Sequence, residues 1–141
     1  MHFVTGGAYN GKSKWVRRIW DSPIDWRSAY EGDSWNEPTF NEHVIVLEGL
    51  EEWMIAFVAK KKDFKEIRES WRAYLESLLA WESEDCDRRI IIIGTDITKG
   101  IVPLEKENRT WRDAVGWAYQ DLAALAERVD VIWYGLNQRL K

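Results

Sequence analysis

The sequence has little cysteine, little histidine and no long hydrophobic run, and each shortage excludes a class of protein. Cys86 is the single cysteine among 141 residues, so an internal disulfide is excluded and the thiol is expected at the surface. The two histidines, His2 and His43, have no cysteine, aspartate or second histidine at ligand spacing. We therefore expect neither histidine to hold a metal.

Hydrophobic runs are too short to cross a bilayer. The longest purely apolar runs cover only a few residues, as in 90–93, whereas a membrane helix needs about 20. The first residues lack a charged leader followed by a long apolar stretch, so no secretory signal is visible. These absences predict a cytoplasmic protein without a membrane span.

A large excess of charge of one sign is also lacking. Lysine and arginine number 20 against 24 aspartates and glutamates, and no basic block is longer than residues 60–62. Non-specific binding of nucleic acid is disfavoured, because it usually needs a clustered basic face. The length of 141 residues and the hydrophobic content of 45% predict one domain over 1–141 with a core of its own.

Tryptophan is abundant, with ten residues against five tyrosines and four phenylalanines. An indole ring brings a large apolar area and one hydrogen-bond donor, so it serves cores, interfaces and flat ligands alike. Core positions and subunit contacts are its more common uses. We therefore expect most of the tryptophans to have structural roles.

The apolar pattern alternates between strand and helix. Strands are predicted at 3–5, 44–47, 90–93 and 129–134, and the middle two lack polar alternation, which indicates a parallel sheet buried on both faces. Helical spacing follows over 50–58 and 64–79, and a last helix is predicted to start near Thr110 with a capping box. The alternation predicts an α/β sandwich. Residues 21–42 show no sustained period, which indicates a functional loop or structure that the pattern does not reveal.

A glycine-rich motif follows the first predicted strand and precedes a helical pattern. It matches G-x-x-x-x-G-K-[ST] at every fixed position. In such a loop the backbone amides and the helix N-terminus face phosphate oxygens, Lys12 neutralises the β and γ phosphates, and Ser13 binds Mg²⁺. The alternative is a glycine turn with an ordinary surface lysine, which four satisfied positions disfavour. The predicted phosphate-binding residues are Gly6, Gly7, Ala8, Tyr9, Asn10, Gly11, Lys12 and Ser13.

Two carboxylates follow predicted strands at the sheet edge where such folds bind ligands. Glu48 ends the run 44–47 and is predicted to hold Mg²⁺ through water. Asp96 lies just past the run 90–93. With Lys12, they are the predicted catalytic residues, and capping of a helix is the alternative for each carboxylate. For Glu51 and Glu52, in the first turn of a predicted helix, capping is the favoured interpretation.

These residues resemble the bifunctional adenosylcobinamide kinase/adenosylcobinamide-phosphate guanylyltransferases of cobalamin biosynthesis. Residues 3–13 are similar to the family's V-T-G-G-A-x-x-G-K-S opening, and residues 100–103 to its G-I-V-P element. Glu48 and Trp53 are similar to positions of its D-C-x-T-x-W-x-x-N segment, and Asp96 to the acidic residue before G-I-V-P. The resemblance implies a three-layer P-loop NTPase sandwich with a mostly parallel central sheet. It also implies a kinase using ATP or GTP with Mg²⁺, and a homo-oligomer, trimeric in that family.

The sequence departs from the family between the motif and the next buried strand. Residues 15–42 contain no histidine, whereas the family carries its GMP-accepting histidine in that interval. The comparison therefore implies a kinase without guanylyltransferase activity. Two other functions stay open, namely a nucleotide-binding regulatory protein with little turnover and a kinase or hydrolase for an unrelated small substrate. The corrinoid acceptor and the choice between ATP and GTP stay open as well.

Overall fold

A computed structural model describes residues 1–35, 39–60, 63–97 and 105–141. Its centre is a six-stranded sheet in the order β2-β3-β4-β1-β5-β6. Every neighbouring pair is parallel except β5 and β6, which are antiparallel. The strands are β1 (His2–Gly6), β2 (Ile24–Ser28), β3 (Val44–Glu48), β4 (Arg89–Thr95), β5 (Arg128–Trp133) and β6 (Leu136–Arg139). The helices are α1 (Lys12–Ile19), the 3-10 helix η1 (Ala29–Glu31), α2 (Leu50–Lys60), α3 (Phe64–Ser83) and α4 (Lys106–Leu125).

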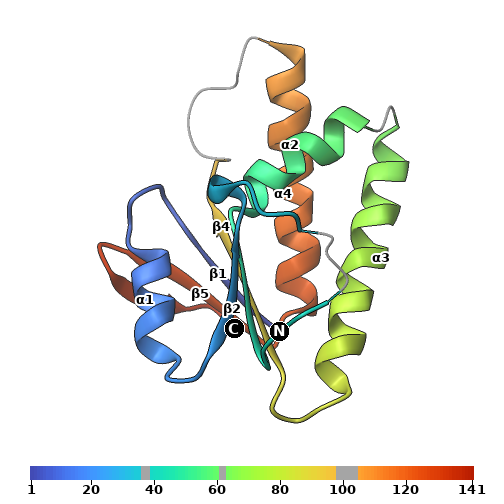
Figure 1. The fold of residues 1–141 in the computed structure, drawn as a ribbon. Helices are drawn as coiled ribbons and strands as arrows, with labels where there is room; N and C mark the ends of the chain where they lie inside the picture. The colour runs from blue at the N-terminus through green and yellow to red at the C-terminus, as the bar shows by residue number, and fades with distance from the viewer. Residues whose placement is uncertain (36–38, 61–62, 98–104) are drawn as a thin grey trace.

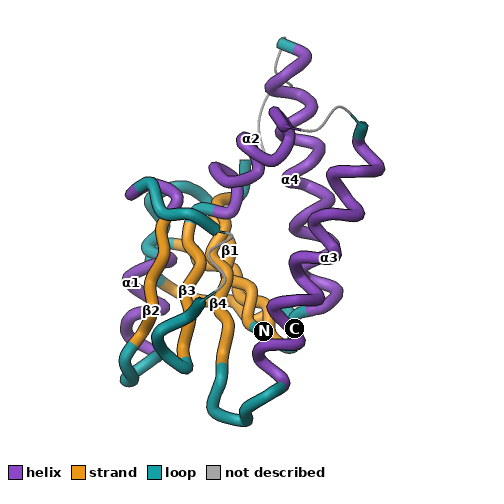
Figure 2. The backbone as a smooth tube through the Cα atoms, turned by 45° about the vertical axis from the view of Figure 1, so that its right-hand side comes forward, coloured by secondary structure: helices purple, strands orange, loops and turns teal. Residues whose placement is uncertain are grey.

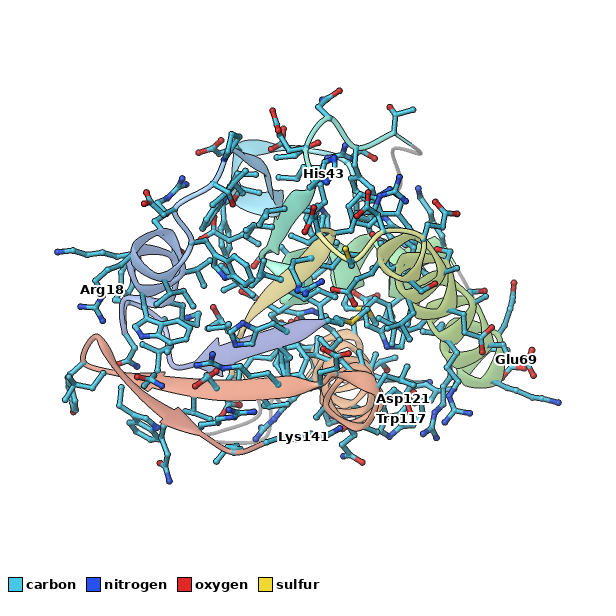
Figure 3. The ribbon with its side chains drawn as sticks, turned by 90° about the horizontal axis from the view of Figure 1, so that it is seen from below. Arg18, His43, Glu69, Trp117, Asp121 and Lys141 are labelled. Atoms are coloured by element: carbon cyan, nitrogen blue, oxygen red, sulfur yellow. The ribbon has the colours of Figure 1, made fainter. Side chains whose placement is uncertain are left out.

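Helices cover both faces of the sheet. Helix α1 lies on one face, and α2, α3 and α4 lie on the other (Figures 1 and 2). Viewed from below, Arg18 of α1 lies on one side of the strands, and Glu69 of α3 and Asp121 of α4 lie on the other (Figure 3). The predicted three-layer α/β sandwich with a mostly parallel sheet is confirmed.

Strand β4 shows why the sheet forms as the apolar runs predict. The side chains of Ile90, Ile91, Ile92 and Ile93 are all at most 1% exposed. Successive side chains of a strand point to opposite faces, so Ile90 and Ile92 join the core under α2, α3 and α4, whereas Ile91 and Ile93 join the core under α1. Burial on both faces explains the absence of polar alternation in this strand.

Two strands were not predicted, and both lie at sheet edges. The stretch 21–42 contains β2 and η1, so the second of its two interpretations, structure that the apolar pattern does not reveal, is the one that the fold bears out. Trp26 of β2 lies against the core under α1, whereas Trp35 and Phe40 lie against the other core. At the C-terminal end, β5 stops at Trp133, and the chain turns into β6 instead of continuing one residue further.

The predicted start of the last helix is also wrong. Helix α4 begins at Lys106, and the Thr110 hydroxyl donates a hydrogen bond to the Lys106 carbonyl at 3.0 Å. Thr110 therefore lies one turn inside the helix, where a hydroxyl commonly bonds to the carbonyl four residues earlier. The G-I-V-P residues 100–103 lie outside the described residues.

Asp130 of β5 links its own strand to the neighbouring strands β1 and β6. Its carboxylate is fully buried and faces His2 Nε2 at 2.8 Å, Arg128 Nε at 2.6 Å and Asn137 Nδ2 at 2.9 Å. Burial alone would raise the pKa of Asp130, but the hydrogen bonds from Arg128, Asn137 and His2 lower it below its ordinary 3.8. Stability from this carboxylate is thus fully present above pH 3.8 and is lost as the pH falls through the lowered pKa.

We expect Asp130→Asn to lower the free energy of unfolding at neutral pH by about 1–3 kcal/mol, because an amide leaves buried donors without their charged acceptor. Urea unfolding at pH 7 and pH 3, in a His2→Gln background that removes the neighbouring imidazole, measures the effect. The difference in unfolding free energy that Asp130→Asn causes in this background should shrink at pH 3. An equal difference at both pH values would show that the carboxylate's charge is unimportant.

Candidate functional site

A cleft lies at the edge of the sheet where the parallel strands end. Its walls come from the glycine-rich loop and the start of α1, from η1, from the end of β3 with the first turn of α2, and from the end of β4. This is the edge at which open α/β sheets bind ligands. The lining residues are Ala8, Tyr9, Gly11, Lys12, Ser13, Lys14, Tyr30, Glu48, Glu51, Glu52, Ile93, Thr95 and Ile97.

The glycine-rich loop joins β1 to α1, as the motif predicts. Gly6 has φ 140°, and a Cβ there would lie 2.4 Å from the Ile132 carbonyl oxygen, so no larger residue fits without displacing β5. The Lys12 ammonium bends back over the loop and donates to the carbonyls of Gly6 at 3.2 Å and Gly7 at 2.9 Å. Burial lowers the pKa of Lys12, and the charges of Glu51 and Glu48 oppose that shift. A cation is thus fixed over the loop.

Ser13 and Glu48 meet in the cleft although they come from α1 and β3. The Ser13 hydroxyl donates to Glu48 Oε1, and Trp26 Nε1 donates to Glu48 Oε2 at 2.8 Å. The Arg17 guanidinium lies 3.6 Å from the centre of the Trp26 ring, which fixes the indole from the other side. A hydroxyl and a carboxylate are oxygen ligands of the kind that Mg²⁺ prefers, so this pair fits the predicted ion. Sequence reasoning missed Trp26, because it lies on the unpredicted strand.

Asp96 is held beside the loop through its backbone. Its amide donates to the Gly6 carbonyl at 3.0 Å, which joins the end of β4 to the end of β1. Thr95 and Ile97, which flank Asp96, line the cleft. The structure therefore brings Asp96 close to the motif, and its catalytic role stays a prediction.

Glu51 is a buried carboxylate that sequence reasoning assigned to helix capping. It is 2% exposed, and Oε2 accepts hydrogen bonds from the Thr95 amide at 2.8 Å and the Tyr119 hydroxyl at 3.2 Å, while Oε1 accepts one from the Tyr30 hydroxyl. Its side chain thus connects α2 with η1, β4 and α4, and the capping interpretation is wrong. No local signal marks it, because its partners are far away in the sequence.

The two tyrosines around Glu51 stay protonated. Burial, followed by the hydrogen bond from the Tyr30 hydroxyl to Glu51, raises the pKa of Tyr30 above its ordinary 10.0. Burial also raises the pKa of Tyr119 well above that value, with the charge of Glu51 as the next cause. Both hydroxyls therefore remain donors to the carboxylate. Glu48 and Glu51 place two carboxyl groups in the cleft that holds Lys12.

A second group of ligand-type side chains lies at the opposite edge of the sheet, where β3 and β4 begin. Atoms of His43, Asp85 and Asp87 that are able to ligate a metal lie within 4.8 Å of one another. The expectation that His43 has no companion ligand rested on spacing in the sequence, and the fold brings the two aspartates to it. Exposed carboxylates commonly gather without a metal, so this group alone identifies no centre.

Comparisons with known proteins identify a family and one curated relative. The family described as cobinamide kinase/cobinamide phosphate guanyltransferase matches residues 23–140. The bifunctional adenosylcobalamin biosynthesis protein CobU of Escherichia coli (strain K12) is 28% identical over 79 residues, which are 56% of this chain and 43% of that protein. The chain thus matches less than half the length of this curated relative.

Within the described part of the chain, no helix combines the length and the apolar character that a membrane crossing requires.

The family match covers most of the chain, from β2 to the end of β6. This chain therefore belongs to the cobinamide kinase/cobinamide phosphate guanyltransferase family.

Proposed function

We propose that this chain is a nucleotide-dependent kinase of cobalamin biosynthesis, which transfers a phosphoryl group from ATP or GTP to cobinamide. The observation that carries the proposal is the buried Lys12 ammonium over the glycine-rich loop, with the Ser13–Glu48 contact beside it. Family membership supports the acceptor class. Phosphoryl transfer needs positioning and charge stabilisation above all, and this cleft offers both.

The triphosphate lies along the loop in this proposal. Its oxygens replace the carbonyls of Gly6 and Gly7 as partners of Lys12, and the amides at the start of α1 donate to them. Ser13 and Glu48 would hold Mg²⁺, which would supply positive charge to offset the negative charge of the phosphates. The acceptor hydroxyl attacks the γ phosphorus while the bond to the β,γ-bridging oxygen breaks. Lys12 stabilises the negative charge that remains on the β phosphate.

Asp96 or Glu48 takes the proton that the acceptor hydroxyl releases, and Asp96 is the one that holds no metal in this arrangement. Its backbone bond to Gly6 places it at the end of β4, beside the loop that carries the phosphates. Arg109 and Arg112 of α4 are candidates to offset negative charge on the substrates. A loose transition state needs only weak base catalysis, so positioning of the hydroxyl matters more than basicity.

The segment between α1 and β3 supports the loss of guanylyl transfer. Strand β2 runs directly into the three-residue helix η1, and no histidine occurs in residues 15–42. The same observation favours a second candidate function, a regulatory protein that binds nucleotide with little turnover. A homo-oligomer remains a proposal that follows from family membership, and sedimentation equilibrium tests it.

A coupled assay for release of ADP or GDP, with cobinamide and adenosylcobinamide as acceptors, tests the proposed kinase. We expect turnover of order 1–100 per second and a phosphorylated corrinoid detectable by mass spectrometry. Calorimetry with Mg-ATP and Mg-GTP accompanies it. Nucleotide binding without a phosphorylated corrinoid would contradict the acceptor assignment and favour the regulatory protein. Failure to bind either nucleotide would contradict both functions.

A further inference from the structure

Two tyrosines, one in the glycine-rich loop and one in the turn that is fastened to it, combine a left-handed backbone with an exposed ring. Tyr9 has φ 59° and is fully exposed, and Tyr134 has φ 50° and is 89% exposed. The left-handed region is unfavourable for residues with bulky side chains. Such conformations gather at functional sites, where the surrounding structure holds them in place. The occurrence of two such residues in adjoining segments therefore calls for a function of the two rings.

Asn10 links the two tyrosines. It follows Tyr9 in the loop, its side-chain oxygen accepts a hydrogen bond from the Tyr134 amide at 3.1 Å, and its carbonyl accepts one from the Gly135 amide at 2.9 Å. These bonds fasten the turn between β5 and β6 to the loop between β1 and α1, and the two segments lie side by side (Figure 1).

The turn itself favours a different residue at position 134. Tyr134 and Gly135, with φ 50° and 78°, separate the paired residues Trp133 and Leu136, which makes a two-residue hairpin turn. A turn with positive φ at both central residues prefers Asn-Gly. A tyrosine that exposes 89% of its surface gains little from protein contacts. Its ring faces are instead open to a ligand.

The order of the strands decides which end of a nucleotide would reach this turn. Glu48 ends β3 and the turn follows β5, and these strands lie on opposite sides of β1. The Ser13–Glu48 pair would hold the ion that accompanies the terminal phosphates, which puts that end of the nucleotide on the β3 side. The base lies at the other end of a nucleoside triphosphate and extends toward β5 and β6.

Resting on the proposed nucleotide binding, we infer that Tyr134, together with Tyr9, forms a stacking surface for the base of the nucleotide. Stacking of a base on an aromatic ring tolerates different bases, because each presents a π face. The surface therefore takes both ATP and GTP, and its contribution to their affinity is independent of the phosphate contacts. Tripolyphosphate, which has no base, gains nothing from it.

The test compares Mg-ATP, Mg-GTP and magnesium tripolyphosphate by isothermal titration calorimetry on wild type and Tyr134→Asn. Asparagine suits the left-handed turn, so we expect the variant to melt at the wild-type temperature or about 2–4 °C above it. The affinity for both nucleotides should fall about 5- to 100-fold, whereas that for tripolyphosphate should stay unchanged. Tyr134→Phe keeps the ring and should keep the nucleotide affinity. Leu136→Ala, at an exposed neighbour in the same hairpin, is the matched control.

Three outcomes would overturn these assignments. Unchanged affinity of Tyr134→Asn for both nucleotides overturns the stacking surface and leaves phosphate binding in place. An equal loss for nucleotide and tripolyphosphate also overturns it, because the turn would then act on the loop through Asn10. A wild-type chain that binds neither nucleotide nor tripolyphosphate overturns the phosphate site itself, and the stacking surface with it.

Discussion

Replacement of Lys12 by methionine is expected to reduce phosphoryl transfer about 10²- to 10³-fold and to weaken nucleotide binding strongly. Lys12 is 8% exposed, and its ammonium lies over the loop where the proposed triphosphate binds. A cation that is fixed and shielded from solvent stabilises phosphate charge far better than a solvated one. Methionine keeps the length of the side chain and removes the charge. Calorimetry and the coupled assay with cobinamide measure both effects.

Lys14→Met is the matched control for this substitution. Lys14 also lines the cleft but is exposed, so its ammonium interacts with phosphate through water. We expect a much smaller loss from Lys14→Met, and one that salt diminishes. If the two variants lose the same affinity, the loop attracts nucleotide by general charge, and the assignment of Lys12 is wrong.

Glu48→Gln is expected to reduce the affinity for Mg²⁺ about 10- to 100-fold and to lower transfer correspondingly. The amide has nearly the shape of the carboxylate, so the Ser13 hydroxyl and the Trp26 indole each keep an atom within reach. What disappears is one negative charge at the proposed metal position. For the same reason, nucleotide without Mg²⁺ should bind the variant more tightly than wild type, because one repulsion has been removed.

The affinity for Mg²⁺ should fall while the affinity for nucleotide without Mg²⁺ should rise, and a general loss of structure would not change the two in opposite directions. Titration of nucleotide with and without Mg²⁺ measures both on one protein sample. Glu52→Gln, which removes an exposed charge from the same cleft, should weaken the dependence on Mg²⁺ only slightly. A variant at Glu48 that retains the wild-type dependence on Mg²⁺ would remove this carboxylate from the metal site.

The features that sequence analysis predicted correctly are those carried by contiguous residues. The glycine-rich loop has its fixed positions within residues 6–13, and the buried strand β4 shows its four isoleucines in a row. Strand β2 also carries a signal, because Ile24 and Trp26 alternate with Asp25 and Arg27. Pro23 and the irregular residues that follow obscured these five positions. An edge strand with charged residues on one face is the hardest strand to predict from composition.

The missed site residues depend on the tertiary structure. Glu51 is buried because Tyr30, Thr95 and Tyr119 surround its carboxylate, and these residues come from three other elements. The first turn of a helix favours an acidic residue whatever the fold, so the local pattern gave Glu51 a simpler explanation. Likewise, Thr110 has the composition of a cap, and only the position of the preceding turn shows that α4 starts earlier.

The strand order also bears on how the chain is synthesised and folded. Strand β4 (Arg89–Thr95) lies between β1 and β3, although both of these strands are synthesised before it. The contact between Ser13, which follows β1, and Glu48 of β3 therefore requires β4 to have inserted between them. A nascent chain on the ribosome that has not yet reached Thr95 lacks this contact. Parallel pairing of distant segments is slow, which leaves the early strands exposed to aggregation meanwhile. Because only the completed sheet carries the assembled Ser13–Glu48 pair, a ligand bound there would act as a pharmacological chaperone and draw late folding intermediates toward the native state.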